Sequence, residues 1–258
     1  LIKSLTGIAL VLLYGELELL IIGIVFAEAL ALILSLYVIR RRFGPFAPQF
    51  QFSVWWDFLS RSAPIGLGVI FSVLYFRLDI VMLQLMTDDR VVGFYSAAYK
   101  LFEVVVVLPH SLMIVLFPSL VEVFHTDREK FKIIFKKAFT VYFVVGSSIA
   151  LIFFGFSNEI IGLIYGDNFL FSVKILEILA IAIALSFLIF LLSNVLIVSG
   201  WEMTNTWSLV GATILNIALN LAWIPMHGAI GAAWATVVCE IALIVMLAFQ
   251  SRKAFKEP

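Results

Sequence analysis

Residues 75–103 read YFRLDIVMLQLMTDDRVVGFYSAAYKLFE, and this stretch places four ionisable side chains inside segments that otherwise have the composition of membrane-spanning helices. A charged side chain in the hydrocarbon core of a bilayer costs from about 2.5 kcal/mol upward, so it usually pairs with another charge or faces a water-filled pathway. We therefore expect function in this part of the chain. The four residues are Arg77, Asp79, Lys100 and Glu103.

The composition outside this stretch is that of a polytopic membrane protein. Of 258 residues, 63% are hydrophobic and 13% are charged, whereas an average soluble domain has roughly 25% charged residues. Positive and negative charges balance, which excludes a nucleic-acid binder that works through bulk charge. The single cysteine, Cys239, excludes an intramolecular disulfide and a cysteine-cluster metal site.

Apolar runs of about 20 residues are long enough to cross the hydrocarbon core as helices. Because a lipid-exposed backbone must satisfy its own hydrogen bonds, and because barrel-type alternation is absent, each run is expected to be helical. The sequence thus predicts an all-α membrane protein, with seven full spans and a partial one at about residues 5–14. The full spans are 19–39, 61–86, 93–122, 138–157, 173–198, 206–225 and 228–250.

The lysines and arginines predict the orientation of these spans, since positive residues favour cytoplasmic loops. If residues 40–42, all arginines, are cytoplasmic, alternation puts most of the 17 Lys and Arg residues on the same side. Arg90 and Lys174 then fall outside, while Arg77 and Lys100 lie within spans. We expect a multi-pass protein of the plasma (inner) membrane with a cytoplasmic C-terminus.

Two polar segments are expected to lie at the cytoplasmic surface. Residues 43–60 include Trp55 and Trp56, which favour the headgroup level, so this segment predicts a connector with an interfacial amphipathic helix. Residues 125–137 are basic and amphipathic, and attraction to anionic lipid headgroups explains them without a protein partner. The last residues, 251–258, form a predicted cytoplasmic tail.

Enzyme motifs are absent from the sequence. It has no GxxxxGK[ST] phosphate loop and no HExxH pair, and its three histidines are scattered. The predicted outer loops are short, which disfavours a membrane glycosyltransferase or polymerase, because such enzymes usually need a sizeable outer loop to hold catalytic acids over a sugar. We expect no catalytic residue, no metal and no cofactor.

Helical phase limits how the four charges can pair. A helix turns about 100° per residue, so Arg77 and Asp79 point to nearly opposite faces, whereas Lys100 and Glu103 share one face. The hairpin cannot close both acid–base pairs: either Asp79 meets Lys100 or Arg77 meets Glu103, and the unpaired member faces a cavity or another helix. A closed ion-pair network that only fixes packing remains the alternative to a cation that faces substrate.

Other polar residues lie inside the predicted spans. Asn216 and Asn220 share one face of the span 206–225, where they can contact substrate or hydrogen-bond to another helix. Glu28 and Glu240 are single acids near the middle of their spans. Each is a candidate ion-coupling site or a partner for a charge on another helix.

A segment with Arg77, Asp79 and Met82, followed by VGFYSAAYK at residues 92–100, resembles the polysaccharide (O-antigen type) flippases. These proteins belong to the multidrug, oligosaccharidyl-lipid and polysaccharide exporter superfamily. The resemblance runs over most of residues 60–250 and includes LFP at 116–118, IYG at 164–166 and Phe169.

The resemblance implies a domain organisation. Proteins of this superfamily have two similar six-helix bundles, so residues 61–250 are expected to form the complete C-terminal bundle. Residues 1–42 then supply the last two helices of the N-terminal bundle, the first of them partial. Because most of that bundle is missing and the chain starts at Leu1 within an apolar run, we expect an N-terminally truncated sequence.

The resemblance also implies alternating-access transport of a lipid-linked oligosaccharide for cell-surface polysaccharide such as the O-antigen of lipopolysaccharide. Arg77 and Lys100 match the cavity cations that would meet the polyprenyl diphosphate carrier, and a cation in low dielectric offers charge-assisted hydrogen bonds to such an anion. Tyr75 and Tyr99 can stack on sugar faces. Membrane lipids, and polysaccharide assembly proteins, are the expected partners; nucleic acid is not.

Two alternatives stay open. A cation-coupled multidrug exporter of the same superfamily would rely on acids, namely Glu28, Asp79 and Glu240. A membrane glycosyltransferase or polysaccharide polymerase would need external catalytic acids. The buried cations favour the flippase.

Overall fold

The computed structural model describes residues 17–44 and 51–254 of the chain. Every regular element in these ranges is a helix, which confirms the predicted all-α class. The chain divides into two compact units, residues 1–58 and 59–258. The predicted partial span at residues 5–14 lies outside the described residues.

The first unit contains α2, Leu17–Phe43, which includes the predicted span 19–39. Three arginines occupy its last turn, where the helix dipole favours positive charge. No residue of its apolar stretch, Ile21–Arg42, is buried within this unit. A helix that is apolar all round and uncovered needs lipid or other helices around it.

Helix α3, Phe52–Met86, begins in the first unit and continues into the second. Trp55 and Trp56 lie in its first turns and are exposed. The expected interfacial helix and the predicted span 61–86 are therefore parts of one helix, and residues 45–50 of the predicted connector lie outside the described residues.

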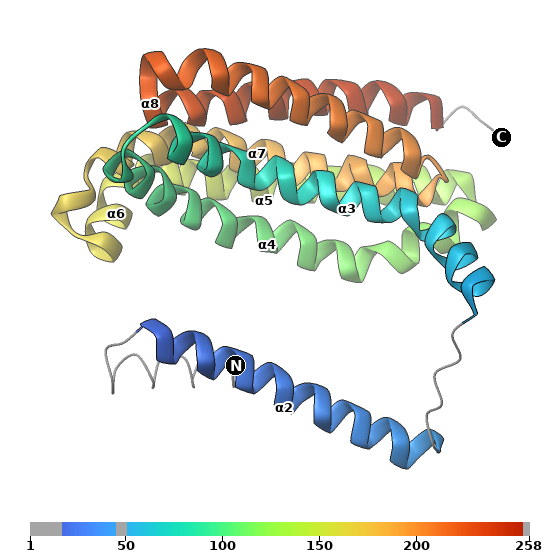
Figure 1. Ribbon diagram of the computed structural model, residues 1–258. Helices are drawn as coiled ribbons and strands as arrows, with labels where there is room; N and C mark the ends of the chain where they lie inside the picture. Colours follow the sequence, from blue (N-terminus) through green and yellow to red (C-terminus); the bar gives the residue numbers. More distant parts are fainter. Residues whose placement is uncertain (1–16, 45–50, 255–258) are drawn as a thin grey trace. The chain divides into compact units, whose positions relative to one another are not determined.

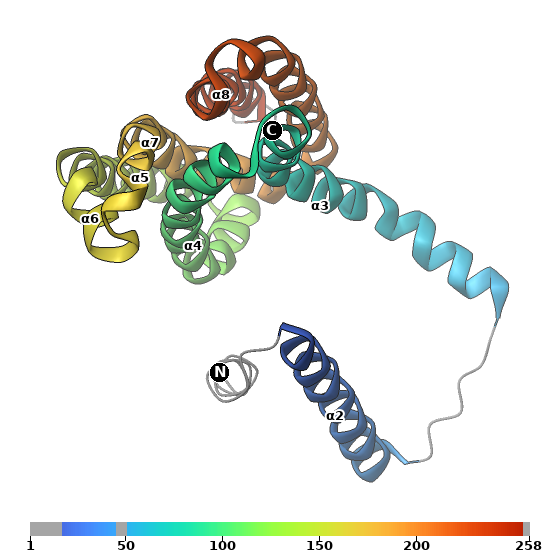
Figure 2. The ribbon, with the colours of Figure 1, turned by 60° about the vertical axis from the view of Figure 1, so that its left-hand side comes forward.

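In the second unit, α7 is the central helix, and α4, α5 and α8 pack around it (Figures 1 and 2). The unit's main apolar core runs along α7, most of whose span is buried. Two short elements, which the sequence did not predict, join α5 to α7. The helices after α3 are α4 (Asp89–Thr126), α5 (Arg128–Gly155), α6 (Ser157–Tyr165), η1 (Asp167–Phe169), α7 (Phe171–Val198) and α8 (Glu202–Ala254).

Aspartates fix the starts of α4 and α5. Asp88 accepts a hydrogen bond from the backbone N–H of Val91 at 2.9 Å, and Asp127 accepts one from Lys130 at 2.9 Å. Such N-caps satisfy donors that the first helical turn leaves open. Because α5 already begins at Arg128, the predicted basic surface segment is largely the first part of a membrane helix.

Helix α8 is a hairpin of two antiparallel limbs, which Figure 1 shows in orange and red. Gly228 makes the reversal with φ 55° and ψ −134°, a conformation that glycine adopts readily. The limbs are so close that a Cβ on Gly231 would lie 2.5 Å from the carbonyl oxygen of Trp223. The limbs correspond to the predicted spans 206–225 and 228–250, so the seven full spans are all present among the described helices.

Positive charge gathers at one end of the second unit. The α4–α5 turn, the α7–α8 turn and the end of α8 lie together on the right of Figure 1, while the α3–α4 turn and the turn between the two limbs of α8 lie at the opposite end. We call the first of these the basic end. Its described cations are Arg128, Lys130, Lys132, Lys136, Lys137 and Arg252.

Candidate functional site

Arg77, Lys100 and Glu103 form one ionic cluster on the α3–α4 hairpin. The Nη1 atom of Arg77 lies 3.0 Å from Oε1 of Glu103, and the Nζ atom of Lys100 lies 3.1 Å from Oε2 of the same residue. Of the two pairings that helical phase allowed, the structure forms Arg77 with Glu103. One carboxylate is thus shared by two cations, and the cluster keeps a formal charge of about +1.

The two cations are open on one side. Their side chains are 56% and 65% exposed, against 20% for Glu103. The cluster lines a pocket of about 490 Å³, here called the cation pocket, together with Ser72 and Phe76. The remaining lining residues are Val73, Phe102, Val104, Val106 and Val107.

The depth of the cation pocket decides what it can face. Arg77 lies nine residues before the end of α3, or about 14 Å along the helix, and Lys100 lies eleven residues after the start of α4, or about 16 Å. Both are near the middle of a hydrocarbon core about 30 Å thick. Because an exposed charge at that depth is costly against lipid, this face of the unit is suited to line a polar cavity.

Asp79 lies in the interior, on the other side of α3 from Arg77. Only 1% of it is exposed, and four side-chain donors meet its two carboxylate oxygens. Asn216 and Asn220 donate to Oδ1 at 2.8 and 2.6 Å, while Tyr95 and Thr236 donate to Oδ2 at 2.9 and 2.6 Å. These five residues, the Asp79 cluster, join α3, α4 and both limbs of α8.

The carboxyl group of Asp79 is surrounded by hydrogen-bond donors rather than paired with a cationic side chain. The groups of the Asp79 cluster are all oxygen-bearing, and Oδ1 of Asn220 is buried without a hydrogen-bond partner. Amides and hydroxyls can turn an oxygen toward a ligand in place of a donor. Hard cations prefer oxygen ligands, so the cluster can exchange its donors for a bound monovalent cation.

No metal group of the usual multi-acid kind occurs elsewhere in residues 17–44 and 51–254, where no three His, Cys, Asp or Glu side chains gather. The Asp79 cluster is not such a group, because it contains a single acid. The sequence left Asn216 and Asn220 open between substrate contact and hydrogen bonding to another helix, and here both donate to Asp79 of α3. It did not predict Tyr95 and Thr236 as partners of Asp79. In this structure all five are enclosed within the unit.

The two candidate sugar-stacking tyrosines also lie in the interior. The hydroxyl of Tyr99 donates to the carbonyl oxygen of Phe76 at 2.6 Å, and its ring stacks on Tyr95 with centroids 5.5 Å apart. Tyr75 is buried, and its hydroxyl has no hydrogen-bond partner. A contact of either ring with sugar stays a prediction, one that requires the ring faces to become uncovered.

The candidate coupling acids occupy different environments. Glu240 is 1% exposed on the second limb of α8, one turn beyond Thr236. It accepts a hydrogen bond from Ser186 at 2.6 Å through Oε1, while Oε2 has no partner. Glu28 is exposed on α2, in the first unit. An ion-coupling role for either acid stays a prediction.

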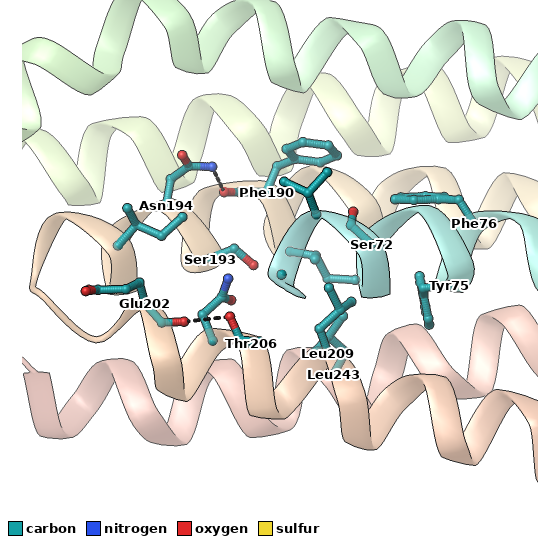
Figure 3. A pocket seen from close by; sticks show the side chains of 15 residues that line it. Ser72, Tyr75, Phe76, Phe190, Ser193, Asn194, Glu202, Thr206, Leu209 and Leu243 are labelled. Atoms are coloured by element: carbon teal, nitrogen blue, oxygen red, sulfur yellow. Dashed lines mark hydrogen bonds between the residues drawn. The ribbon is translucent and has the colours of Figure 1, made fainter. Parts of the chain in front are cut away.

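A second pocket, of about 570 Å³, lies between α3, α7 and α8 and adjoins the cation pocket through Ser72 and Phe76 (Figure 3). Asn194 and Glu202 lie at one end of it, and Tyr75 at the other. We call it the acidic pocket, since Glu202 is its charged residue. Its residues come from three distant segments, so no local pattern could have predicted it.

Two comparisons with known proteins bear on this geometry. The family described as "Polysaccharide biosynthesis protein" matches residues 1–124, a range that contains the Arg77–Lys100 segment. It ends before the IYG segment at 164–166, so it covers less of the second unit than the sequence resemblance suggested. No curated protein matches the chain at a significant level.

Among solved structures, the "Lipid II flippase MurJ, inward closed conformation" has the same fold, with a TM-score of 0.76 at 20% sequence identity. The match covers 98% of this chain and 56% of that one, so the chain spans little more than half of that protein's length. The family match agrees with the resemblance to proteins of polysaccharide biosynthesis, and the structural match shows a shared fold.

Proposed function

We propose, from the chain's relationship to the polysaccharide flippases, that the protein moves a lipid-linked oligosaccharide across the plasma membrane by alternating access, for cell-surface polysaccharide of the O-antigen type. The observation that carries this proposal is the pair of exposed cations at mid-depth, Arg77 and Lys100. The fold shared with a protein titled as a lipid II flippase supports it. The C-terminus is cytoplasmic in this proposal, as the basic end suggests.

The cation pocket suits the diphosphate of a polyprenyl carrier. The arginine offers a planar fork that matches phosphate oxygens, and the lysine offers a mobile point charge. Glu103 holds both cations in place when no substrate is present. Because exposed ion pairs contribute only about 0–1 kcal/mol, a multiply charged diphosphate can displace this single carboxylate at small cost.

Binding of a monovalent cation in the Asp79 cluster would supply energy for the same movement. A monovalent cation entering it would replace four hydrogen bonds that join α3, α4 and α8. Uptake would therefore change the packing of the helix that carries Arg77. The same cluster, with Glu240, is the observation that favours the second candidate function, a cation-coupled multidrug exporter.

A transport assay with the whole protein in lipid vesicles tests the main proposal. The probe is a fluorescent oligosaccharide on a polyprenyl diphosphate, with a polyprenyl monophosphate form for comparison. Changing Arg77 and Lys100 together to Gln should lower diphosphate transport by at least about tenfold, because two charge-assisted contacts are lost. Changing Lys130 and Lys132 to Gln is the matched control, since it removes the same charge at the basic end.

Unimpaired diphosphate transport by the double variant would contradict the role of the cation pocket. Transport of lipophilic cationic dyes in place of the lipid-linked sugar, abolished by Asp79→Asn, would favour the exporter.

A further inference from the structure

A third pocket lies at the basic end, between α5, α7 and α8, and it belongs to neither the cation pocket nor the Asp79 cluster. Its volume is about 430 Å³. Among its described lining residues the charged ones are Lys136 of α5 and Arg252 of α8, both exposed, and none is acidic. The other lining residues are Phe135, Phe139, Leu188, Leu192, Ile244, Ala248 and Ser251.

The charge of this pocket distinguishes it from the rest of the basic end. Lys132 is paired with Glu129 at 2.7 Å, and the guanidinium of Arg128 lies 3.8 Å above the ring of Phe124. Lys136 and Arg252, in contrast, come from different helices and meet at one pocket whose described lining includes no carboxylate. The pocket is therefore arranged to receive an anion.

The walls of the pocket are apolar and extend along the helices. From Arg252 to Ile244 is eight residues, or about 12 Å along α8. Leu188 and Leu192 of α7 and Phe139 of α5 form the facing walls. A small hydrated anion would leave such walls unused, whereas a phosphate that carries acyl chains would cover them.

We propose that this pocket binds an anionic phospholipid, with its phosphate between Lys136 and Arg252 and an acyl chain along Leu188, Leu192 and Ile244. Basic pockets between membrane helices are recurrent sites for anionic headgroups, and charge-assisted hydrogen bonds to phosphate are among the stronger ones. The bound lipid joins the end of α8 to α5.

The acidic pocket provides an internal contrast. It is similar in size and also has apolar walls, but among its described lining residues Glu202 is the charged one, and none is a lysine or arginine. A carboxylate repels phosphate, so shape and apolarity alone do not select an anionic lipid. The pocket between α5, α7 and α8 combines apolar walls with two cations.

The binding experiment uses the whole purified protein in phosphatidylcholine nanodiscs. Phosphatidylglycerol with the same acyl chains is titrated in, retained lipid is counted by native mass spectrometry, and thermal unfolding is followed in parallel. We expect retained phosphatidylglycerol and a raised unfolding temperature. Lys136→Gln with Arg252→Gln should weaken binding by at least about tenfold, as two headgroup contacts are lost.

Two control variants separate the pocket from general surface charge. Lys130→Gln with Lys132→Gln removes the same charge at the same end and should leave binding unchanged. Ala248→Trp keeps both cations but fills the apolar part of the pocket, and it should also weaken binding. Unfolding in pure phosphatidylcholine checks that each variant is folded.

Glycerol phosphate and inorganic phosphate, added at the same concentrations, distinguish a lipid from a free anion. We expect neither to shift the unfolding temperature. Equal binding of phosphatidylcholine, full binding by the Lys136/Arg252 variant, equal loss in the control pair, or an equal shift with free phosphate would each overturn the proposal.

Discussion

The strongest test of the Asp79 cluster compares two substitutions that differ in what they leave behind. Asp79→Ala removes the acceptor of four buried donors. Some of these can find new partners: the hydroxyls of Tyr95 and Thr236 are 3.5 Å apart, and Asn220 already donates to Asn216 at 3.0 Å. About two donors stay unsatisfied, at about 1–3 kcal/mol each, so the expected loss of stability is about 2–6 kcal/mol.

Asp79→Asn keeps the shape and changes the charge. Its amide oxygen can still accept from Asn216 and Asn220, and its amide nitrogen can donate to the hydroxyls of Tyr95 and Thr236, which accept as well as donate. Each of the four groups that contact residue 79 then keeps a hydrogen-bond partner there. We expect a loss of about 1 kcal/mol, the difference between charged and neutral hydrogen bonds.

Thermal unfolding of the purified protein in detergent, followed by tryptophan fluorescence, measures both effects. The unfolding temperature should fall far more for Asp79→Ala than for Asp79→Asn, while both variants lose cation-driven transport. Equal stability of the two variants would refute the reasoning, because it would mean that the buried donors do not depend on this acceptor.

Three further predictions follow from individual contacts. Sodium, compared with choline, should raise the unfolding temperature of the native protein but not that of Asp79→Asn. An equal rise in both proteins would contradict sodium binding at the Asp79 cluster. Gly231→Ala should destabilise the α8 hairpin by about 1–3 kcal/mol, because the added methyl group would lie 2.5 Å from the carbonyl oxygen of Trp223. Gly211→Ala, whose methyl group would meet nothing within 4 Å, should change little in the same unfolding assay. Glu103→Gln should tighten binding of a polyprenyl diphosphate about fivefold in a titration, since an exposed ion pair of up to about 1 kcal/mol no longer competes; weaker binding would show that Glu103 itself contacts the substrate.

The membrane spans could be predicted because lipid imposes one solution on any long apolar run. The limits of that prediction are equally physical. The sequence predicted a turn between the spans 206–225 and 228–250. In the structure the two limbs of α8 follow each other almost without a loop, and the chain reverses at Gly228. The short helix α6 was missed, because nine residues are too few to carry a span signal.

The candidate site was also predicted only in part. Helical phase and the register of one hairpin reduced the pairings to two, and the structure forms the one between Arg77 and Glu103. The bonds from Asp79 to Asn216, Asn220 and Thr236 join residues that are 137, 141 and 157 positions apart. No periodicity within one helix contains that information, and so the cluster had to be seen in three dimensions.

The two sites are nevertheless closely connected, because α3 carries both. Arg77 faces the cation pocket, and Asp79, only two residues away, faces the interior. Tyr99 of α4 donates to the carbonyl oxygen of Phe76, on the same turn of α3, at 2.6 Å. A change at Asp79 that moves α3 against α8 must either carry Tyr99 along or break that bond. If the bond breaks, Arg77 shifts relative to Lys100, which lies next to Tyr99 on α4. In the proposed transport cycle, a cation that binds in the Asp79 cluster and breaks this bond would therefore alter the spacing of Arg77 and Lys100 without contacting the substrate.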